Sequence, residues 1–358
     1  MNLTHTTLAP SVVQTTMRRA LVEPLSGVRV EDTSTPVPTG DLVLVRSTVV
    51  GICGSDTHAL AGHHPFLDRP YAPGHEAVGT VEALGPDATG VDIGQRVLLK
   101  PNVACGACDN CGAGRTNACE NLTWIGCDPS GHWSGAMAEL FVAPSANLYP
   151  VPDDVDDRTA VLVECLATPV HAARISGDLS GARVVVLGAG TIGVFCAVAA
   201  RAAGASRVVV TDLDEGKLAR ALRIGADGAV NASVDDLEVQ VIEALGGRAD
   251  VVMDCVANER SFAQAVQMLR RAGTLDIVGV PARDAVLPMP YIQDYEIRVQ
   301  GSAAYTETDI ETSIAIARSG GIPTDELIAT SFDLEHAADA FESAARDSSG
   351  KVLIRIGE

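Results

Sequence analysis

Positive charge is scarce in this sequence. Its 358 residues include 26 Lys and Arg against 46 Asp and Glu, which gives a net charge of −20 at neutral pH. Only three of the basic residues are lysines, at positions 100, 217 and 351. A protein that binds nucleic acid needs a basic face. The composition therefore argues against a nucleic-acid partner, and the acidity is typical of a solvated surface that favours solubility.

Long apolar runs are also missing. No stretch reaches the roughly 18 apolar residues that a membrane-spanning helix needs, so the sequence predicts no membrane association. The N-terminal segment has no basic region followed by an apolar core, and we predict no signal peptide. We therefore expect a cytoplasmic protein, in which disulfides are rare and clustered cysteines bind metal or carry out chemistry.

The rest of the composition is typical of a globular protein. Hydrophobic residues make up 47% of the chain and charged residues 20%, with 34 Gly and 18 Pro. These values indicate a large buried core and many turns. The length is sufficient for two domains.

Four of the nine cysteines are close together in the sequence, with two, two and seven residues between them. They are Cys105, Cys108, Cys111 and Cys119. A disulfide scaffold does not fit a reducing compartment, and a redox pair needs only two thiols. Four thiolates satisfy a tetrahedral zinc ion and leave no position open. This segment therefore predicts a structural zinc site.

The apolar segments divide the chain into two parts. Short β-like runs separated by turns, at 41–49, 77–84 and 96–99, predict a distorted, mostly antiparallel β domain. After about residue 167, strands and helices alternate, which predicts a doubly wound α/β fold with a parallel sheet. The expected strands are 183–187, 207–212, 228–231, 250–254, 274–280 and 297–302, and the expected helices are 191–204, 215–225 and two that begin near 235 and 259. A last helix, 336–346, and strand, 351–356, are expected to return to the first domain.

The segment "GAGTIG" lies directly between an expected strand and an expected helix. Gly188 suits the tight turn, Gly190 lets the backbone approach a pyrophosphate, and Gly193 lets helix and strand pack closely. The start of the helix, at Thr191 and Ile192, offers free N–H groups to the phosphates.

An acidic residue follows at the distance that dinucleotide-binding sites need. Asp212 lies 19 residues after Gly193, at the end of the second strand, where a carboxylate binds the ribose hydroxyls. A carboxylate there repels the additional phosphate of NADP, and Leu213 follows instead of an arginine. The segment therefore favours NAD. Asp214 is expected to be a helix N-cap.

Three further segments carry residues that can bind metal. "GICGSDTH" contains Cys53 with three polar neighbours, "PGHEAVG" contains His75 and Glu76, and "LVECLATPVHA" contains Glu164. A catalytic zinc ion keeps three protein ligands and one open position. Cys53 and His75 with one of the two carboxylates would supply these ligands.

Together, these motifs resemble the zinc-dependent medium-chain alcohol dehydrogenase family, in the branch of the sorbitol/polyol and butanediol dehydrogenases. The resemblance covers nearly the whole chain. It implies a GroES-like, mostly β catalytic domain at 1–167 and 304–358, and a Rossmann domain at 168–303.

The resemblance also implies roles for individual residues. Cys53 and His75 match the ligands of a catalytic zinc, and either Glu76 or Glu164 completes its coordination. Three residues that follow Cys53 match further functional positions of the family. They are Ser55, which takes the proton of the substrate alcohol, Asp56, which orients the zinc ligands, and His58, which passes the proton to solvent.

The implied activity is hydride transfer between a secondary alcohol, such as a diol or polyol, and NAD. Each subunit is expected to hold two zinc ions, one catalytic and one structural. The expected partners are a small-molecule substrate and other copies of the chain, in a dimer or a tetramer. Three alternatives remain open: an NADP-linked ketone reductase, a threonine-3-dehydrogenase-like enzyme, and a zinc- and NAD-binding sensor without turnover.

Some positions depart from the family pattern. Sorbitol dehydrogenases commonly have arginine before the tyrosine of a "GxFRY" segment, where this chain has Ala304 before Tyr305. The change argues against a long polyol and fits a smaller or less polar alcohol. Cys165 replaces a proline, with no functional interpretation. Phe66 is expected to line the substrate pocket, and His63 and His64 are expected to be loop residues.

Overall fold

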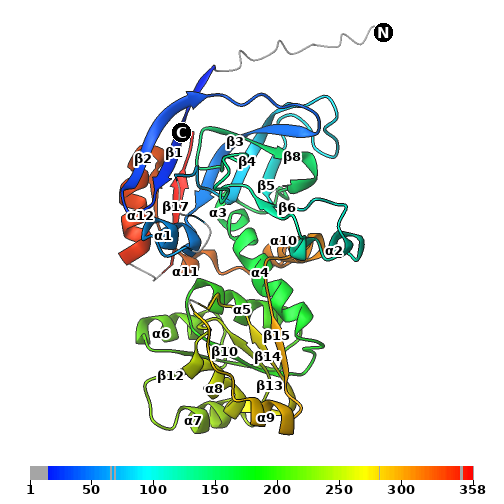
Figure 1. Cartoon of the computed structure of the whole chain (residues 1–358). Coiled ribbons are helices and arrows are strands. Elements are labelled where there is room, and N and C mark those ends of the chain that lie inside the picture. The colour runs from blue at the N-terminus through cyan, green and yellow to red at the C-terminus, as the bar shows by residue number, and fades with distance from the viewer. Residues whose placement is uncertain (1–14, 65–66, 68–69, 282, 347–349, 358) are drawn as a thin grey trace.

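The computed structural model describes residues 15–64, 67, 70–281, 283–346 and 350–357. Two sheets form separate parts of the molecule, one above the other in Figure 1. We call them the mixed-sheet part and the parallel-sheet part. The helices α4 (Leu162–Ile175) and α10 (Glu307–Arg318) lie where the two parts meet.

The parallel-sheet part has six strands in the order β12-β11-β10-β13-β14-β15, and all neighbouring pairs are parallel. The strands are β10 (Arg183–Leu187), β11 (Arg207–Asp212), β12 (Gly228–Asn231), β13 (Ala249–Asp254), β14 (Leu269–Ile277) and β15 (Arg298–Gly301). The helices are α5 (Thr191–Ala202), α6 (Glu215–Arg223), α7 (Leu237–Leu245), α8 (Glu259–Met268) and α9 (Met289–Asp294). This order makes the carboxyl ends of β10 and its neighbours the expected ligand site.

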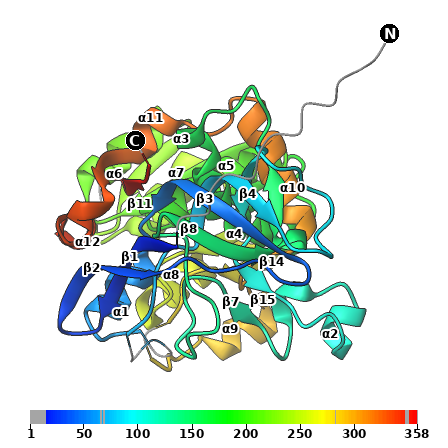
Figure 2. The same cartoon turned by 90° about the horizontal axis from the view of Figure 1, so that it is seen from above.

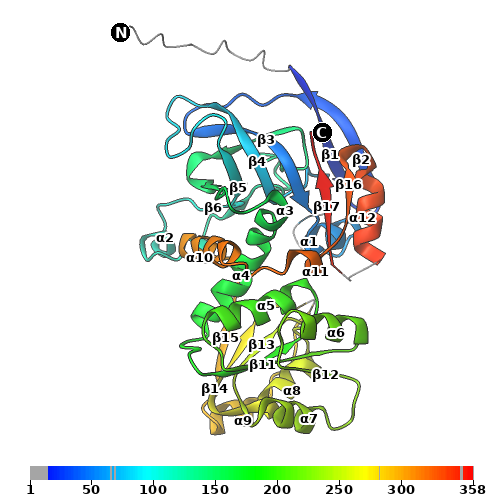
Figure 3. The ribbon, with the colours of Figure 1, turned by 180° about the vertical axis from the view of Figure 1, so that it is seen from behind.

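Both faces of this sheet are buried, which explains the continuous apolar sequence of its strands. On β10, Val184 and Val186 pack with Phe195 of α5. The alternate residue Val185 packs with Val241 of α7 and Phe262 of α8 on the other face. Figure 3 shows α5 and α6 toward the mixed-sheet part and α7, α8 and α9 at the far end.

The mixed-sheet part contains a seven-stranded sheet in the order β16-β17-β3-β4-β5-β9, with β8 paired to β3. The strands are β3 (Leu42–Gly51), β4 (Glu76–Leu84), β5 (Arg96–Leu99), β8 (Leu140–Pro144), β9 (Leu148–Pro150), β16 (Ile328–Asp333) and β17 (Lys351–Arg355). Two smaller sheets accompany it, β1 (Thr16–Glu23) with β2 (Gly27–Ser34), and β6 (Asn102–Val103) with β7 (Thr123–Trp124).

Short helices connect these strands. They are α1 (Gly54–Leu60), α2 (Asp109–Gly112), α3 (Asp157–Ala160), α11 (Thr324–Leu327) and α12 (Ala337–Arg346), with 3-10 turns at Thr116–Ala118, Ser145–Asn147 and Leu334–His336. Leu353 of β17 pairs with Gly51 of β3 in antiparallel register, so the C-terminal strand does return to the first sheet. Seen from above, α2 projects from the side of the molecule, well away from α12 (Figure 2).

Several of the structure's elements differ from the sequence-based expectations. The hairpin of β1 and β2 and the helices α4 and α10 had no predicted counterpart, and neither did the strands β8 and β16; β14 begins five residues earlier than residue 274. α4 runs through residues 167 and 168, where the sequence suggested a domain limit. It packs against both α5 and α10 and forms a shared core with them. Within the described residues, no helix is long and apolar enough to cross a membrane.

Candidate active site

A cleft of about 680 Å³ opens between the two parts of the molecule. The mixed-sheet part contributes Cys53, His58 and Glu76 to its lining, and the parallel-sheet part contributes Gly188 and Asp212. The two motif groups that the sequence singled out separately therefore face one space.

Cys53 and Glu76 line this cleft and belong to a group of metal-ligand side chains. The ligand atoms of Cys53, His75 and Glu76 all lie within 4.8 Å of one another. Cys53 is the N-cap of α1, and His75 and Glu76 lie where β4 begins. His75 and Glu76 are only 4% and 2% exposed. Thiolate, imidazole and carboxylate are the ligands of zinc, and we call these three residues with Glu164 the buried cluster.

Asp56 contacts two residues of the buried cluster, Cys53 and His75. Its carboxylate is fully buried and accepts hydrogen bonds from the backbone N–H of Cys53 at 3.2 Å and the hydroxyl of Tyr71 at 2.9 Å. One of its oxygens lies 3.9 Å from Nδ1 of His75, and Sγ of Cys127 lies 3.2 Å from the same nitrogen. Burial alone would lower the pKa of His75, but Cys127 and Asp56 raise it well above its ordinary value. The surroundings of this imidazole therefore favour positive charge.

The two glutamates have different partners. Oε1 of Glu76 accepts a hydrogen bond from Nζ of Lys351 at 2.7 Å, and Lys351 outweighs the effect of burial and lowers the pKa of Glu76. The other oxygen of Glu76, Oε2, is buried and has no hydrogen-bond partner among the described residues. Such an orphaned carboxylate oxygen fits a cation.

Glu164 comes from α4 and accepts a hydrogen bond from the hydroxyl of Tyr305 at 2.7 Å. Burial and the neighbouring Glu76 raise the pKa of Glu164 to about 7. Cys165, which replaces the proline that the resemblance implies, is buried with its Sγ within 4.8 Å of the carboxylates of Glu76 and Glu164. The structure thus places both predicted carboxylates next to each other, and adds a thiol.

The four-cysteine segment forms a second group, which we call the cysteine lobe (residues 105–119). Its four Sγ atoms all lie within 4.8 Å of one another. Backbone N–H groups of Cys105 and Asn121 donate to Sγ of Cys119 at 3.2 and 3.3 Å. N–H groups of Ala107 and Cys108 lower the pKa of the Cys105 thiol to about 6. The Cys105 thiol is therefore readily deprotonated, as a zinc ligand must be, whereas burial and the neighbouring thiols of Cys108 and Cys119 raise the pKa of Cys111 to about 12.

The glycine-rich segment forms the turn between β10 and α5. Gly188 has φ +94°, a conformation that favours glycine. A Cβ on Gly193 would lie 1.8 Å from the carbonyl oxygen of Gly188, so the helix can approach the turn only with glycine there. A Cβ on Gly190 would meet nothing within 4 Å, which leaves open space above the turn where Thr191 begins α5.

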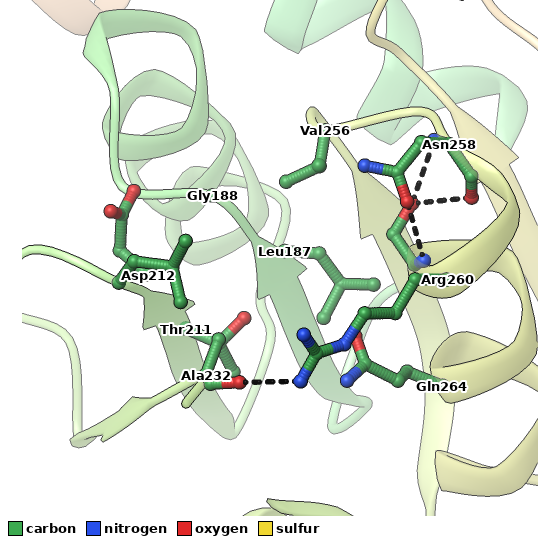
Figure 4. A pocket seen from close by; sticks show the side chains of 11 residues that line it. Leu187, Gly188, Thr211, Asp212, Ala232, Val256, Asn258, Arg260 and Gln264 are labelled. Carbon is green, nitrogen blue, oxygen red and sulfur yellow. Dashed lines mark hydrogen bonds between the residues drawn. The ribbon is translucent and has the colours of Figure 1, made fainter. Parts of the chain in front are cut away.

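Asp212 lies at the end of β11 and faces a pocket of about 270 Å³, shown in Figure 4. Its carboxylate accepts hydrogen bonds from the backbone N–H groups of Ala189, at 2.7 Å, and Asp214, at 3.0 Å. Arg260 and Gln264 line the opposite side (Figure 4). Asp214 accepts a hydrogen bond from the N–H of Lys217 as the N-cap of α6, which confirms that expectation.

The remaining predicted residues are on or near α1. Ser55 is half-buried in its first turn, and His58 lies three residues further on, exposed at the cleft. His63 and His64 follow α1, and neither belongs to a metal-ligand group among the described residues. Phe66 lies outside the described residues.

Sequence reasoning missed three partners of the buried cluster: Tyr71, Cys127 and Lys351. Neither Tyr71 nor Cys127 belongs to a motif, so no signal marked them. Lys351 had one signal, because lysine is rare in the chain, and a buried lysine requires an anionic partner.

Comparison with known proteins identifies the family. The "Alcohol dehydrogenase GroES-like domain" family matches residues 39–153, and the "Zinc-binding dehydrogenase" family matches residues 191–319. Sorbitol dehydrogenase of Bacillus subtilis is 30% identical over 348 residues, which cover 96% of each chain. L-threonine 3-dehydrogenase of Deinococcus deserti is 31% identical over 93% of this chain and 96% of its own.

A solved structure of an Escherichia coli alcohol dehydrogenase in complex with NADH has a TM-score of 0.88 at 26% identity, over 96% of this chain and 100% of that one. The chain belongs to the zinc-dependent medium-chain alcohol dehydrogenase family, in its polyol dehydrogenase branch. It is an oxidoreductase that acts on CH–OH groups, with the predicted GroES-like and Rossmann-type folds.

Proposed function

We propose that this protein oxidises a secondary alcohol, such as a diol, a polyol or a related hydroxyl compound, to the ketone, with NAD as the hydride acceptor. The observation that carries the proposal is the shared cleft. Cys53 and Glu76 line the same space as Gly188 and Asp212, so a metal-held alcohol and a dinucleotide would meet there. The sorbitol dehydrogenase relatives support this substrate class.

The buried cluster fits a catalytic zinc ion. Cys53 and His75 would be two ligands, and Glu76 or Glu164 the third, which leaves one position for the substrate. When bound, zinc acts as a Lewis acid and makes the substrate hydroxyl more acidic. Asp56 would hold His75 in orientation through its Nδ1 side.

Proton transfer is assigned to α1. Ser55 would accept the proton of the substrate hydroxyl. His58 lies three residues later, on the same side of the helix and exposed at the cleft. An imidazole can both accept and donate a proton, which suits a group that delivers a proton to solvent.

The cysteine lobe fits a structural zinc ion. Its four thiols would complete a tetrahedral site with no position for a substrate. Each subunit would therefore hold two zinc ions, one at Cys53 and His75 and one in the lobe.

NAD is proposed over NADP because of Asp212. Its carboxylate is fixed by two backbone N–H groups at the pocket beside Gly188, where it would bind ribose hydroxyls and repel a 2′-phosphate. Thr191 and Ile192 at the start of α5 would face the pyrophosphate. Domain limits at 167/168 and 303/304 would place the cleft at the domain boundary.

The substrate is proposed to be smaller or less polar than sorbitol. Ala304 has no side-chain donor for a distal hydroxyl, where sorbitol dehydrogenases commonly have arginine. An amino alcohol is the second candidate, because L-threonine 3-dehydrogenases are among the relatives that match nearly the whole chain. As the resemblance implies, the enzyme would be a dimer or a tetramer.

The test is NADH formation across a panel of secondary alcohols, diols, polyols and L-threonine. Each substrate is measured with NAD and with NADP, before and after treatment with a zinc chelator. We expect chelator-sensitive turnover of short diols or secondary alcohols with NAD. Turnover of L-threonine alone would select the second candidate, and activity that survives complete zinc removal would contradict the proposed mechanism.

A further inference from the structure

Two cysteines of the parallel-sheet part belong to neither metal-ligand group. Cys196 lies on α5 and is fully buried, and Cys255 directly follows β13 and is half-buried. Their Sγ atoms lie 3.6 Å apart, although 59 positions separate them in the sequence. The fold therefore brings two thiols into direct contact, and the proposed hydride transfer uses neither.

This thiol pair adjoins the glycine-rich turn. The backbone N–H of Cys255 donates to the carbonyl of Leu187 at 2.9 Å, one residue before Gly188. A Cβ placed on Gly188 would lie 3.7 Å from Cβ of Cys255 and 3.1 Å from Val256. Cys255 and Val256 both line the cleft together with Gly188. Cys196 lies on the helix that begins at this turn.

We propose that Cys196 and Cys255 are an oxidation site for hydrogen peroxide, and that the disulfide they form weakens NADH binding. The inference rests on the proposed use of a nicotinamide cofactor in this cleft. The half-buried Cys255 is accessible to a small oxidant, and Cys196 is the only partner thiol that the described residues place beside it.

The oxidation takes place in two balanced steps. The Cys255 thiol gives up its proton and its sulfur attacks one peroxide oxygen, which breaks the O–O bond. Hydroxide leaves, takes that proton and becomes water, and Cys255 is left as a sulfenic acid. Cys196 sulfur then attacks the Cys255 sulfur, forms the S–S bond and displaces hydroxide, which takes the Cys196 proton as the second water. Two thiols lose two electrons and two protons, and one peroxide becomes two waters.

The order of attack follows from burial. The hydrogen bond to Cys255 and burial both raise the pKa of Cys196 well above its ordinary value. Cys196 therefore keeps its proton until a sulfenic acid is present next to it. It then acts as the resolving thiol.

The disulfide would move the wall of the cofactor cleft. A disulfide bond is about 2.05 Å long, so the two sulfurs must approach by about 1.5 Å. Cys196 is enclosed in the core of α5, whereas Cys255 and Val256 border open space. The displacement should therefore fall mainly on residues 255 and 256, which lie against Gly188.

The experiment uses the zinc-loaded full-length protein. It is treated with hydrogen peroxide with and without NADH, and peptide mapping by mass spectrometry looks for a cross-link between Cys196 and Cys255 that has lost two hydrogens. NADH affinity is measured by fluorescence titration before oxidation, after it, and after reduction by dithiothreitol. We expect the cross-link, and a reversible rise in the NADH Kd of about fivefold or more. By linkage, bound NADH should oppose disulfide formation.

Two variants control the interpretation. Cys196→Ala should bind NADH as the wild type does before oxidation, and should show neither the cross-link nor the reversible change in Kd. Cys165→Ala removes a buried thiol elsewhere and should still form the cross-link. If Cys196→Ala does not fold, Cys196→Val takes its place, and the wild-type mapping is decisive without any variant. Released zinc is monitored, so that damage to the cysteine lobe is recognised.

Several results would overturn the inference. They are the absence of the cross-link, a cross-link with unchanged NADH affinity, or a change in Kd that persists in Cys196→Ala and follows zinc release. A protein that forms the cross-link and loses NADH affinity but oxidises no alcohol would refute the proposed function alone. Normal turnover without a cross-link would refute only the oxidation site.

Discussion

The two metal-ligand groups of this protein are built in opposite ways. The cysteine lobe takes all four thiols from one segment of fifteen residues, and it is supported by the backbone N–H groups of Cys105 and of Asn121, two residues after the segment. The buried cluster collects its side chains from α1, β4 and α4, and is supported by Lys351, which is 275 positions away from Glu76. One group is local and the other depends on the whole fold.

Their surroundings differ as well. Three of the four lobe cysteines are at least partly exposed, whereas His75, Glu76 and Glu164 are all less than a tenth exposed. A charged group that is removed from water interacts more strongly with its neighbours, and an unpaired one is costly. Burial thus makes the charge state of the buried cluster sensitive to every charge near it. As the proposed structural zinc site, the lobe would need only its geometry.

The largest expected effect of any single change is at Cys53. Cys53→Ser should lower turnover by about a thousandfold or more, because it removes a thiolate ligand and with it several kcal/mol of Lewis-acid stabilisation. NADH should still bind, since Gly188 and Asp212 lie on the other part of the molecule. Turnover and an NADH fluorescence titration are measured on the same preparation. The matched control is Cys111→Ser, the same substitution in the cysteine lobe, assayed at low temperature. Equal losses in the two variants would erase the proposed distinction between the groups.

A smaller effect is expected at Lys351, whose ammonium group is bonded to Glu76. Lys351→Met leaves Glu76 with a buried, unpaired carboxylate, which should close onto the zinc ion. We expect kcat to fall by about tenfold, within the range known for groups that contact metal ligands. Zinc should be lost more slowly to a chelator, because the carboxylate of Glu76 would be released from Lys351 to bind it. The metal-free variant should lose about 3 kcal/mol of stability, because one half of a buried ion pair remains.

Lys100 provides the control for this change. Its side chain is also buried and pairs with Glu307 at 3.0 Å, and it donates to the carbonyl of Asn102 and not to a residue of the buried cluster. Lys100→Met should lower the melting temperature and leave kcat and zinc retention close to those of the wild type. Faster zinc loss in Lys351→Met would show that Lys351 stabilises the zinc-binding form instead of competing with it.

The same contrast explains what the sequence could predict. Cys105, Cys108, Cys111 and Cys119 are close in sequence, so their spacing alone indicates one site. The alternation of strands and helices around "GAGTIG" likewise depends on local periodicity, and the structure places β10, α5 and β11 within a few residues of the predictions.

Contacts between distant segments were not predictable in this way. Nothing in the sequence near Lys351 indicates that it meets Glu76, and nothing near Cys127 indicates that it meets His75. The pairing of β17 with β3 decides the first contact, and the loop after β7 decides the second. α4 was missed because "LVECLATPVHAARI" contains a proline and is apolar on most sides, so it lacks the periodicity of a surface helix.

The smallest expected effect on catalysis is in the cysteine lobe. Cys111→Ser should remove one zinc ion per subunit and lower the free energy of unfolding by several kcal/mol, because a structural zinc contributes directly to folding. The lobe also contacts the segment before α10, where Asn117 donates to the carbonyl of Ala303 at 2.9 Å. Loss of the zinc ion would act on turnover only indirectly, through contacts of this kind. Turnover well below the melting temperature should therefore fall by only about threefold or less, a minor part of the effect of Cys53→Ser. Zinc content, thermal unfolding and kcat are measured together. A variant that keeps its melting temperature but loses turnover would place the lobe in the chemistry, and the division between a structural and a catalytic group would be wrong.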